Sequence, residues 1–143
     1  MVKYIVVHCS DSPNGRLDKR FDSAGAIHMW HKQPPNNFDG IGYHFVIDEN
    51  GETAHGRPIF PDTKTIWPGA HVKYFNSVSI GICLIGSDYF HLEQMQTLRD
   101  EIDYLHSIWP DAELVGHYEL DKKKTCPNFN VKAWYKTGEL KQA

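Results

Sequence analysis

The sequence predicts a mixed α/β domain, one central sheet flanked by helices, spanning residues 1–143. Three observations lead to this prediction. Short β-branched runs alternate with segments of helical periodicity, an Asn-Gly pair marks a hairpin, and the expected order is strand, helix, hairpin, strand, helix, strand, helix. A chain of 143 residues with 41% hydrophobic and 23% charged residues can bury a core as a single domain.

The N-terminal half is expected to alternate between strands and loops. The β-branched run over residues 3–8 is typical of a central strand. Asp22 or Ser23 would cap a helix running to about Lys32, which Pro34 and Pro35 end. The other expected segments are a loop over 9–20, a strand over 41–48, a turn at 49–51, a return strand over 52–55 and an irregular loop over 57–68.

The C-terminal half contains the clearest helix. Apolar residues recur there at spacings of three and four, which predicts one buried stripe ended by Pro110. Asn130 would cap a last short helix. The other expected segments are a strand over 77–85, a strand over 113–116 and a polar loop over 117–125. The stripe consists of Leu92, Met95, Leu98, Ile102, Leu105 and Trp109.

Composition narrows the partners and the compartment. A formal net charge of −3 gives no sign of a nucleic-acid binder, and any capture of anionic material must be local. Three cysteines, an odd number, argue against a disulfide framework. The apolar run at the N-terminus is too short for a signal peptide or a membrane span. We therefore expect a monomer without membrane partners, made in the cytoplasm without a signal peptide.

Two histidines and a cysteine form a possible zinc site. His8 ends the first expected strand, His117 follows the last, and Cys126 lies nine residues further on. Strand ends are rigid, and the loops after them commonly form active sites in α/β folds. Two imidazoles and a thiolate suit Zn²⁺, and three protein ligands leave a fourth position for water. The alternative is a buried strand-end histidine and an inert cysteine.

A second histidine pair competes with this site. His28 and His31 lie three residues apart on the expected first helix, so their side chains would share a face. Trp30 between them marks the packed region, and core or surface roles are favoured for both. Cys9 and Cys83 are expected to be packing residues.

Seven blocks of residues, in one order over about residues 4–135, carry a resemblance to a known family. Together they resemble the zinc-dependent N-acetylmuramoyl-L-alanine amidases of the phage-lysozyme type, relatives of peptidoglycan recognition proteins. The blocks are Val7-His8-Cys9-Ser10, Trp30-His31, Gly40-Ile41-Gly42-Tyr43-His44-Phe45, Gly69-Ala70-His71, Asn76 with Ser79-Ile80-Gly81-Ile82-Cys83, Gly116-His117 and Lys124-Thr125-Cys126-Pro127.

The resemblance implies a fold, an activity and a role for each matching residue. It implies one catalytic Zn²⁺, hydrolysis of the amide between N-acetylmuramic acid and L-alanine in peptidoglycan, and a phage or prophage endolysin that reaches the cell wall after release. The metal ligands would be His8, His117 and Cys126, the catalytic residues Tyr43 and Lys124, and the substrate-binding residues His71 and Asn76.

Some residues depart from the family's pattern. Three adjacent lysines precede Cys126, so Lys123 remains an alternative to Lys124. Tyr74 stands where relatives often carry glycine, which would narrow the cleft. His44 is expected to be structural, because it neighbours Tyr43 and points to the opposite face of a strand. Two other functions stay open: a module of the same fold that binds peptidoglycan without cutting it, and a regulatory partner protein.

Overall fold

A five-stranded mixed sheet forms the centre of the molecule, as the sequence predicts. The computed structural model describes residues 1–11 and 41–140. The strand order is β3-β2-β6-β1-β7, and only the β2–β3 pair is antiparallel. The strands are β1 (Tyr4–Cys9), β2 (Phe45–Ile47), β3 (Thr53–His55), β6 (Ser79–Leu84) and β7 (Glu113–Gly116).

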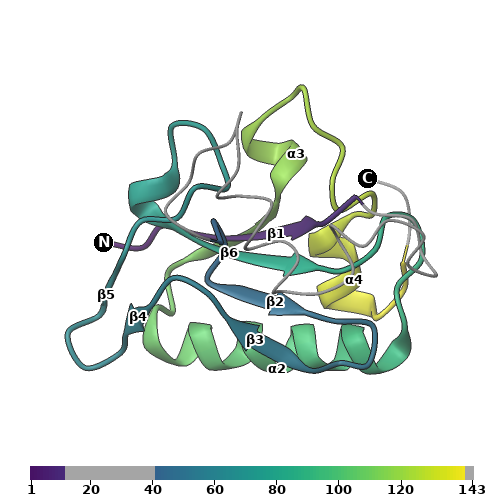
Figure 1. The fold of residues 1–143 in the computed structure, drawn as a ribbon, viewed down its shortest axis with the longest axis horizontal. Coiled ribbons are helices and arrows are strands. Elements are labelled where there is room, and N and C mark those ends of the chain that lie inside the picture. Colours follow the sequence, from purple (N-terminus) through teal and green to yellow (C-terminus); the bar gives the residue numbers. More distant parts are fainter. Residues whose placement is uncertain (12–40, 141–143) are drawn as a thin grey trace.

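Helices lie on both sides of this sheet (Figure 1). The long helix α2 (Leu92–Ile108) runs along one side, and the short helix α3 (His117–Leu120) lies on the other. Helix α4 (Val131–Thr137) buries Val131 and Trp134 in the same core as α2, and a 3₁₀ turn, η1 (Asn76–Val78), precedes β6. The predicted first helix and most of the loop before it lie outside the described residues. None of the helices described is long and apolar enough to cross a membrane.

Side-chain alternation along the two central strands divides them between two faces. Successive residues of a strand point to opposite sides of a sheet. One set packs into the main core with α2 and α4, and the other set faces α3, where the polar site is built. The main-core set is Ile5, Val7, Cys9, Ile80, Ile82 and Leu84, and the opposite set includes Val6, His8, Ser79, Gly81 and Cys83.

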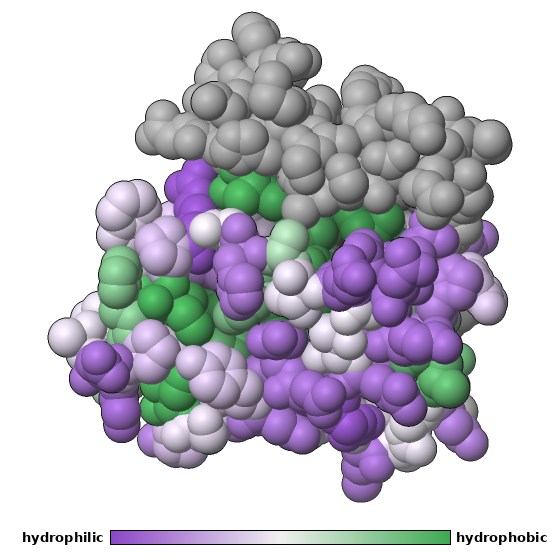
Figure 2. All heavy atoms as spheres, turned by 60° about the horizontal axis from the view of Figure 1, so that its bottom comes forward, coloured by the Kyte–Doolittle hydropathy of each residue, from purple (hydrophilic) through white to green (hydrophobic). Residues whose placement is uncertain are grey.

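The apolar stripe of α2 is confirmed with one exception. Met95, Leu98, Ile102 and Leu105 are buried, whereas Leu92 is 70% exposed. The inner position at the start of the helix belongs to Gln94, whose Nε2 donates hydrogen bonds to the carbonyl oxygens of Ile47 and Ile85. The outer side of α2 is polar, and Figure 2 shows mainly hydrophilic side chains over the described surface on this side of the molecule.

One predicted turn and one predicted helix cap are present in the structure. The Asp48 carboxylate accepts hydrogen bonds from the N–H groups of Asn50 and Glu52, and Gly51 takes a positive φ of 85° in the turn between β2 and β3. This is the hairpin that the Asn-Gly pair predicts. Asn130 caps α4 through a 3.0 Å bond from the Ala133 N–H, as its position before the helix predicts.

Three predicted boundaries are wrong. The strand expected over 41–48 shortens to Phe45–Ile47, because Gly42 and Tyr43 bond instead to Ala70 and Arg57 of the following loop. The loop expected over 57–68 contains a small antiparallel pair, β4 (Ile59–Phe60) and β5 (Thr65–Ile66). The polar loop expected over 117–125 begins with α3, whose first turn is closed by the Glu119 carboxylate accepting from the Gly116 N–H.

Candidate metal centre

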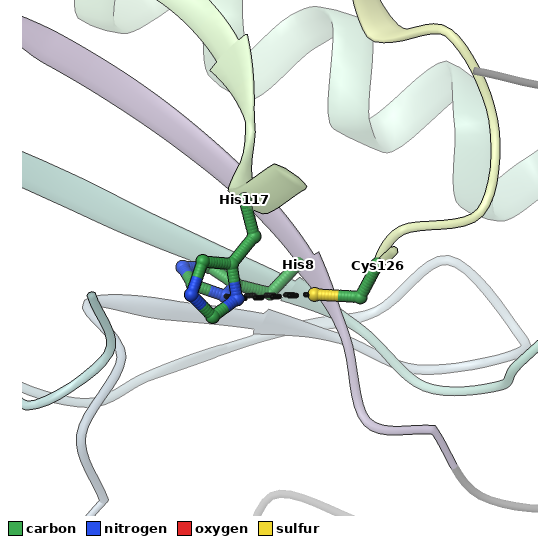
Figure 3. A group of neighbouring side chains, drawn as sticks. All are labelled: His8, His117 and Cys126. Carbon is green, nitrogen blue, oxygen red and sulfur yellow. Dashed lines mark hydrogen bonds between the residues drawn. The ribbon is translucent and has the colours of Figure 1, made fainter. Parts of the chain in front are cut away.

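His8, His117 and Cys126 meet at one end of the sheet (Figure 3). His8 lies near the end of β1, and His117 follows β7, which pairs with β1 in parallel. Parallel neighbours bring their carboxyl ends to the same edge, so the two rings face each other. Cys126 reaches them from the loop before α4. The two Nδ1 atoms lie 3.1 Å apart, and Cys126 Sγ lies 3.2 Å from His117 Nδ1 and 3.9 Å from His8 Nδ1.

These separations fit one tetrahedral metal ion. With Zn–N bonds of about 2.0–2.1 Å and a Zn–S bond of about 2.3 Å, two nitrogens would lie about 3.3 Å apart and each nitrogen about 3.6 Å from the sulfur. The Nδ1–Nδ1 distance of 3.1 Å is slightly shorter than the first value, and the two Nδ1–Sγ distances of 3.2 and 3.9 Å bracket the second. Two imidazole nitrogens and a sulfur are also the donor types that a zinc ion prefers. Among residues 1–11 and 41–140, this is the group of side chains that could hold a metal.

The site's electrostatics favour the protonation states that metal ligands need. Burial lowers the pKa of His8, which keeps its imidazole neutral. A hydrogen bond from Cys9, followed by bonds from His117 and His8, lowers the pKa of the Cys126 thiol and favours the thiolate. The pKa of Cys9 is raised by the same hydrogen bond and by burial, so Cys9 is the donor of the pair. Cys9 thus contacts the site, beyond the packing role predicted for it.

A cleft of about 730 Å³ opens beside His117. One wall is formed by residues 70–74 and Asn76, and the other by residues 120–124. Among the described residues that line it, four are lysines and Asp121 alone is acidic, although the whole chain has a formal charge of −3. The lysines are Lys73, Lys122, Lys123 and Lys124. The cleft is therefore locally cationic and suits a ligand that carries carboxylates.

The two predicted catalytic residues lie near different members of the metal cluster, Tyr43 against His8 and Lys124 in the cleft beside His117. The Tyr43 ring is tilted against the His8 ring with centroids 5.1 Å apart, and burial raises the pKa of its phenol well above the ordinary value. Lys124 lines the cleft together with Lys122 and Lys123. Its backbone N–H closes a turn by donating to the Asp121 carbonyl at 3.0 Å. Their catalytic roles stay predictions.

The two predicted substrate-binding residues line the cleft, but much of their bonding is directed inward. The ring of His71 is buried. Its Nδ1 lies 2.8 Å from His8 Nε2, and its Nε2 lies 3.3 Å from Ser79 Oγ. Asn76 Oδ1 accepts hydrogen bonds from the N–H groups of His71 and Val72. Substrate contact by His71 and Asn76 stays a prediction. Ser79, the first residue of β6, belongs to one of the matching blocks, but a serine beside an apolar strand gives no local signal of a role in the site.

Two further predictions concern histidines outside the metal centre. His44 accepts at Nδ1 from the Gly81 N–H and donates from Nε2 to the Trp67 carbonyl, in agreement with the structural role predicted for it. The alternative pair, His28 and His31, lies outside the described residues.

Comparison with known proteins identifies relatives that match most of the chain. Residues 1–129 match the family model described as N-acetylmuramoyl-L-alanine amidase. The chain is 33% identical to the endolysin of Enterobacteria phage K11, covering 94% of this chain and 85% of that one. It is 34% identical to the endolysin of Escherichia phage T7, with 95% and 87% covered. The solved amidase LysC from Clostridium intestinale URNW superposes with a TM-score of 0.76 at 26% identity, covering 96% of this chain and 85% of that one.

Proposed function

The chain belongs to the N-acetylmuramoyl-L-alanine amidase family, and from this premise we propose that its catalytic centre is one Zn²⁺ held by His8, His117 and Cys126. The enzyme hydrolyses the amide between N-acetylmuramic acid and L-alanine in peptidoglycan as a phage endolysin. The observation that carries the proposal is the convergence of two Nδ1 atoms and one Sγ at separations that a tetrahedral zinc ion would span.

The three ligands suit a catalytic rather than a structural zinc. Three protein donors would leave one coordination position for water, and the proposed ligand His117 lines a cleft that is open to solvent. When bound, Zn²⁺ supplies Lewis acidity and lowers the pKa of a coordinated water toward neutrality. A thiolate and two neutral imidazoles leave about one positive charge on the centre.

Tyr43 and Lys124 would stabilise the charge that develops on the lactyl carbonyl oxygen. Burial keeps the Tyr43 phenol protonated, so it can donate a hydrogen bond to an oxyanion. Lys124 lines the same cleft as His117 and carries an ammonium group that can do the same. Such donors, held in place before the reaction, act most strongly where water is excluded.

The cationic cleft would receive the peptide portion of the substrate. Stem peptides of peptidoglycan carry carboxylates, and the lysines on the two walls would attract them locally in spite of the chain's net negative charge. We further propose that residues 1–143 form one catalytic domain that acts as a monomer. It would be made in the cytoplasm and act on the cell wall after release.

The test measures metal and activity together. Purified protein loaded with zinc should contain one zinc per chain by mass spectrometry and release stem peptides from purified cell walls. His8→Ala, His117→Ala and Cys126→Ala should each lose both properties. His55→Ala, on the edge strand β3, is the matched control and should retain both. Full wall digestion by zinc-free protein, or by all three ligand variants, would overturn the proposed centre.

A further inference from the structure

His71 contacts the proposed ligand His8 on the side away from the metal position. His8 turns Nδ1 toward His117 and Cys126, and its other nitrogen, Nε2, lies 2.8 Å from His71 Nδ1. The two rings are nearly perpendicular, at 84°, with centroids 4.9 Å apart. His71 is therefore placed to determine which nitrogen of His8 carries the proton.

A chain of hydrogen bonds continues from His71 to a backbone carbonyl. His71 Nε2 lies 3.3 Å from Ser79 Oγ, and Ser79 Oγ lies 2.8 Å from the carbonyl oxygen of Phe75. A carbonyl oxygen can only accept, so the Ser79 hydroxyl donates its single proton to Phe75. The lone pairs of Ser79 Oγ are then free to accept a hydrogen bond from His71 Nε2.

The direction of this chain can be followed back to His8. A neutral imidazole has one N–H and one lone pair, so a His71 that donates from Nε2 must accept at Nδ1. Its partner at Nδ1 is His8 Nε2, which must therefore carry the His8 proton. The remaining nitrogen, His8 Nδ1, then presents its lone pair toward His117 and Cys126. A metal ion binds through this lone pair.

The surroundings of His71 hold its ring in this position. A Cβ added at Gly81 would lie 2.7 Å from both Cγ and Nδ1 of the ring, so glycine is needed to make room for it. Asn76 holds the His71 backbone.

We infer that His71 is a positioning residue that fixes His8 with its proton on Nε2 and its Nδ1 lone pair toward the metal position before any metal binds. This inference rests on the proposed zinc centre and assigns that centre an outer residue. Ser79 takes part in this positioning, because its hydroxyl sets the direction of the hydrogen-bond chain. Outer partners of metal-binding histidines typically contribute about 10–100-fold to metal affinity.

The first experiment reads the tautomer directly and needs no metal. Full-length protein with ¹⁵N-labelled histidine, stripped of metal, is measured by NMR through the long-range couplings between ring nitrogens and ring protons. Wild-type His8 and His71 should both carry the proton on Nε2. Ser79→Ala removes the hydroxyl that accepts from His71 Nε2, so His8 and His71 should shift toward the Nδ1–H form. A wild-type His8 protonated on Nδ1 would overturn the inference.

The second experiment measures zinc affinity by competition with a chelator. His71→Leu should weaken zinc binding by on the order of 10–100-fold. His71→Asn should retain most of the affinity, because its side-chain oxygen can accept from His8 Nε2. His55→Leu is the control for loss of a histidine elsewhere, and near-ultraviolet circular dichroism reports whether each variant is folded.

The outcomes separate this inference from the proposed function. If wild-type protein binds zinc tightly and folded His71→Leu binds it equally well, the positioning role is wrong while the zinc centre stands. If wild-type protein binds no zinc, the proposed centre fails, and the tautomers of the metal-free protein still decide the role of His71. Should His71→Leu not fold, Ser79→Ala decides: unchanged zinc affinity and unchanged tautomers would contradict the inference.

Discussion

Asn76 holds the backbone of His71 through its side-chain oxygen, which accepts from the N–H groups of His71 and Val72 at 2.9 Å each. One side chain thus satisfies two donors of the loop that forms a wall of the cleft. The contact links the loop before β6 to the proposed metal centre, because the His71 ring touches the ligand His8.

Removing this oxygen should destabilise the loop. Asn76→Ala leaves two part-buried N–H groups without their acceptor, which should lower the free energy of unfolding by about 1–3 kcal/mol. Asn76→Asp is the matched control, since a carboxylate keeps the accepting oxygen in place. Urea unfolding of the metal-free proteins measures the difference. Equal stability of Asn76→Ala and wild type would show that the two hydrogen bonds contribute nothing.

Kinetic measurements can show which of the three lysines at 122–124 takes part in catalysis. Lys124 is two residues from Cys126 and lines the cleft with Lys122 and Lys123. Lys124→Ala should lower kcat by about 10²–10³-fold, the usual loss for one oxyanion donor, with zinc content unchanged. Lys122→Ala, in the same loop, should change kcat far less. A large loss in Lys123→Ala with a normal Lys124→Ala would move the role to Lys123.

Tyr43 should act as a hydrogen-bond donor. Burial raises the pKa of its phenol, so the group stays protonated at neutral pH and cannot serve as a phenolate base. Tyr43→Phe removes the donor but keeps the ring against His8. Its kcat should fall by on the order of 10²-fold while its zinc affinity stays within a few-fold of wild type. A Phe variant with wild-type kcat would exclude the phenol from catalysis.

Segments with a regular apolar spacing or with characteristic turn residues could be predicted from the sequence, and segments without such local patterns could not. The stripe of α2 and the hairpin at Gly51 follow from spacing and turn chemistry alone. Strands β4 and β5 are two residues each, too short to show alternation. Helix α3 did have a signal: Glu119 lies three residues after Gly116, and its carboxylate accepts from the Gly116 N–H, as the glutamate of a capping box does.

In the candidate site, too, residues with a local sequence signal could be predicted, whereas contacts between segments far apart in the sequence could not. Strand ends followed by polar loops pointed to His8 and His117, and Cys126 in the loop after His117 supplied a third donor type that suits zinc. The family resemblance then implied the same three ligands. The relation between His71 and His8 spans 63 residues and depends on parallel pairing of β1 with β6. Ser79 and Gly81 carry no helical or turn signal of their own, because their roles are to bond and to make room for a ring from another segment.

His44 should make the metal-free protein sensitive to acid. Burial lowers its pKa from 6.5 to about 4, while Nδ1 accepts from Gly81 and Nε2 donates to Trp67. Below about pH 6.5 the unfolded chain binds a proton at His44 that the folded chain binds only near pH 4. The contribution of His44 to stability is therefore complete above about pH 6.5 and decreases as the pH falls toward 4, by on the order of 3 kcal/mol in all.

His44→Asn tests this dependence, because its side-chain oxygen can still accept from the Gly81 N–H but does not titrate. The free energy of unfolding is measured by urea with chelator present, at about pH 7 and about pH 5. Wild type should lose more stability between the two than His44→Asn does. The buried His8 and His71, whose pKa values are also lowered, remain in both proteins. Because His44 is one of the groups that lower the pKa of His71, the difference between the two slopes reports His44 together with its effect on His71. Identical pH slopes would mean that the His44 pKa is close to that of an unfolded chain.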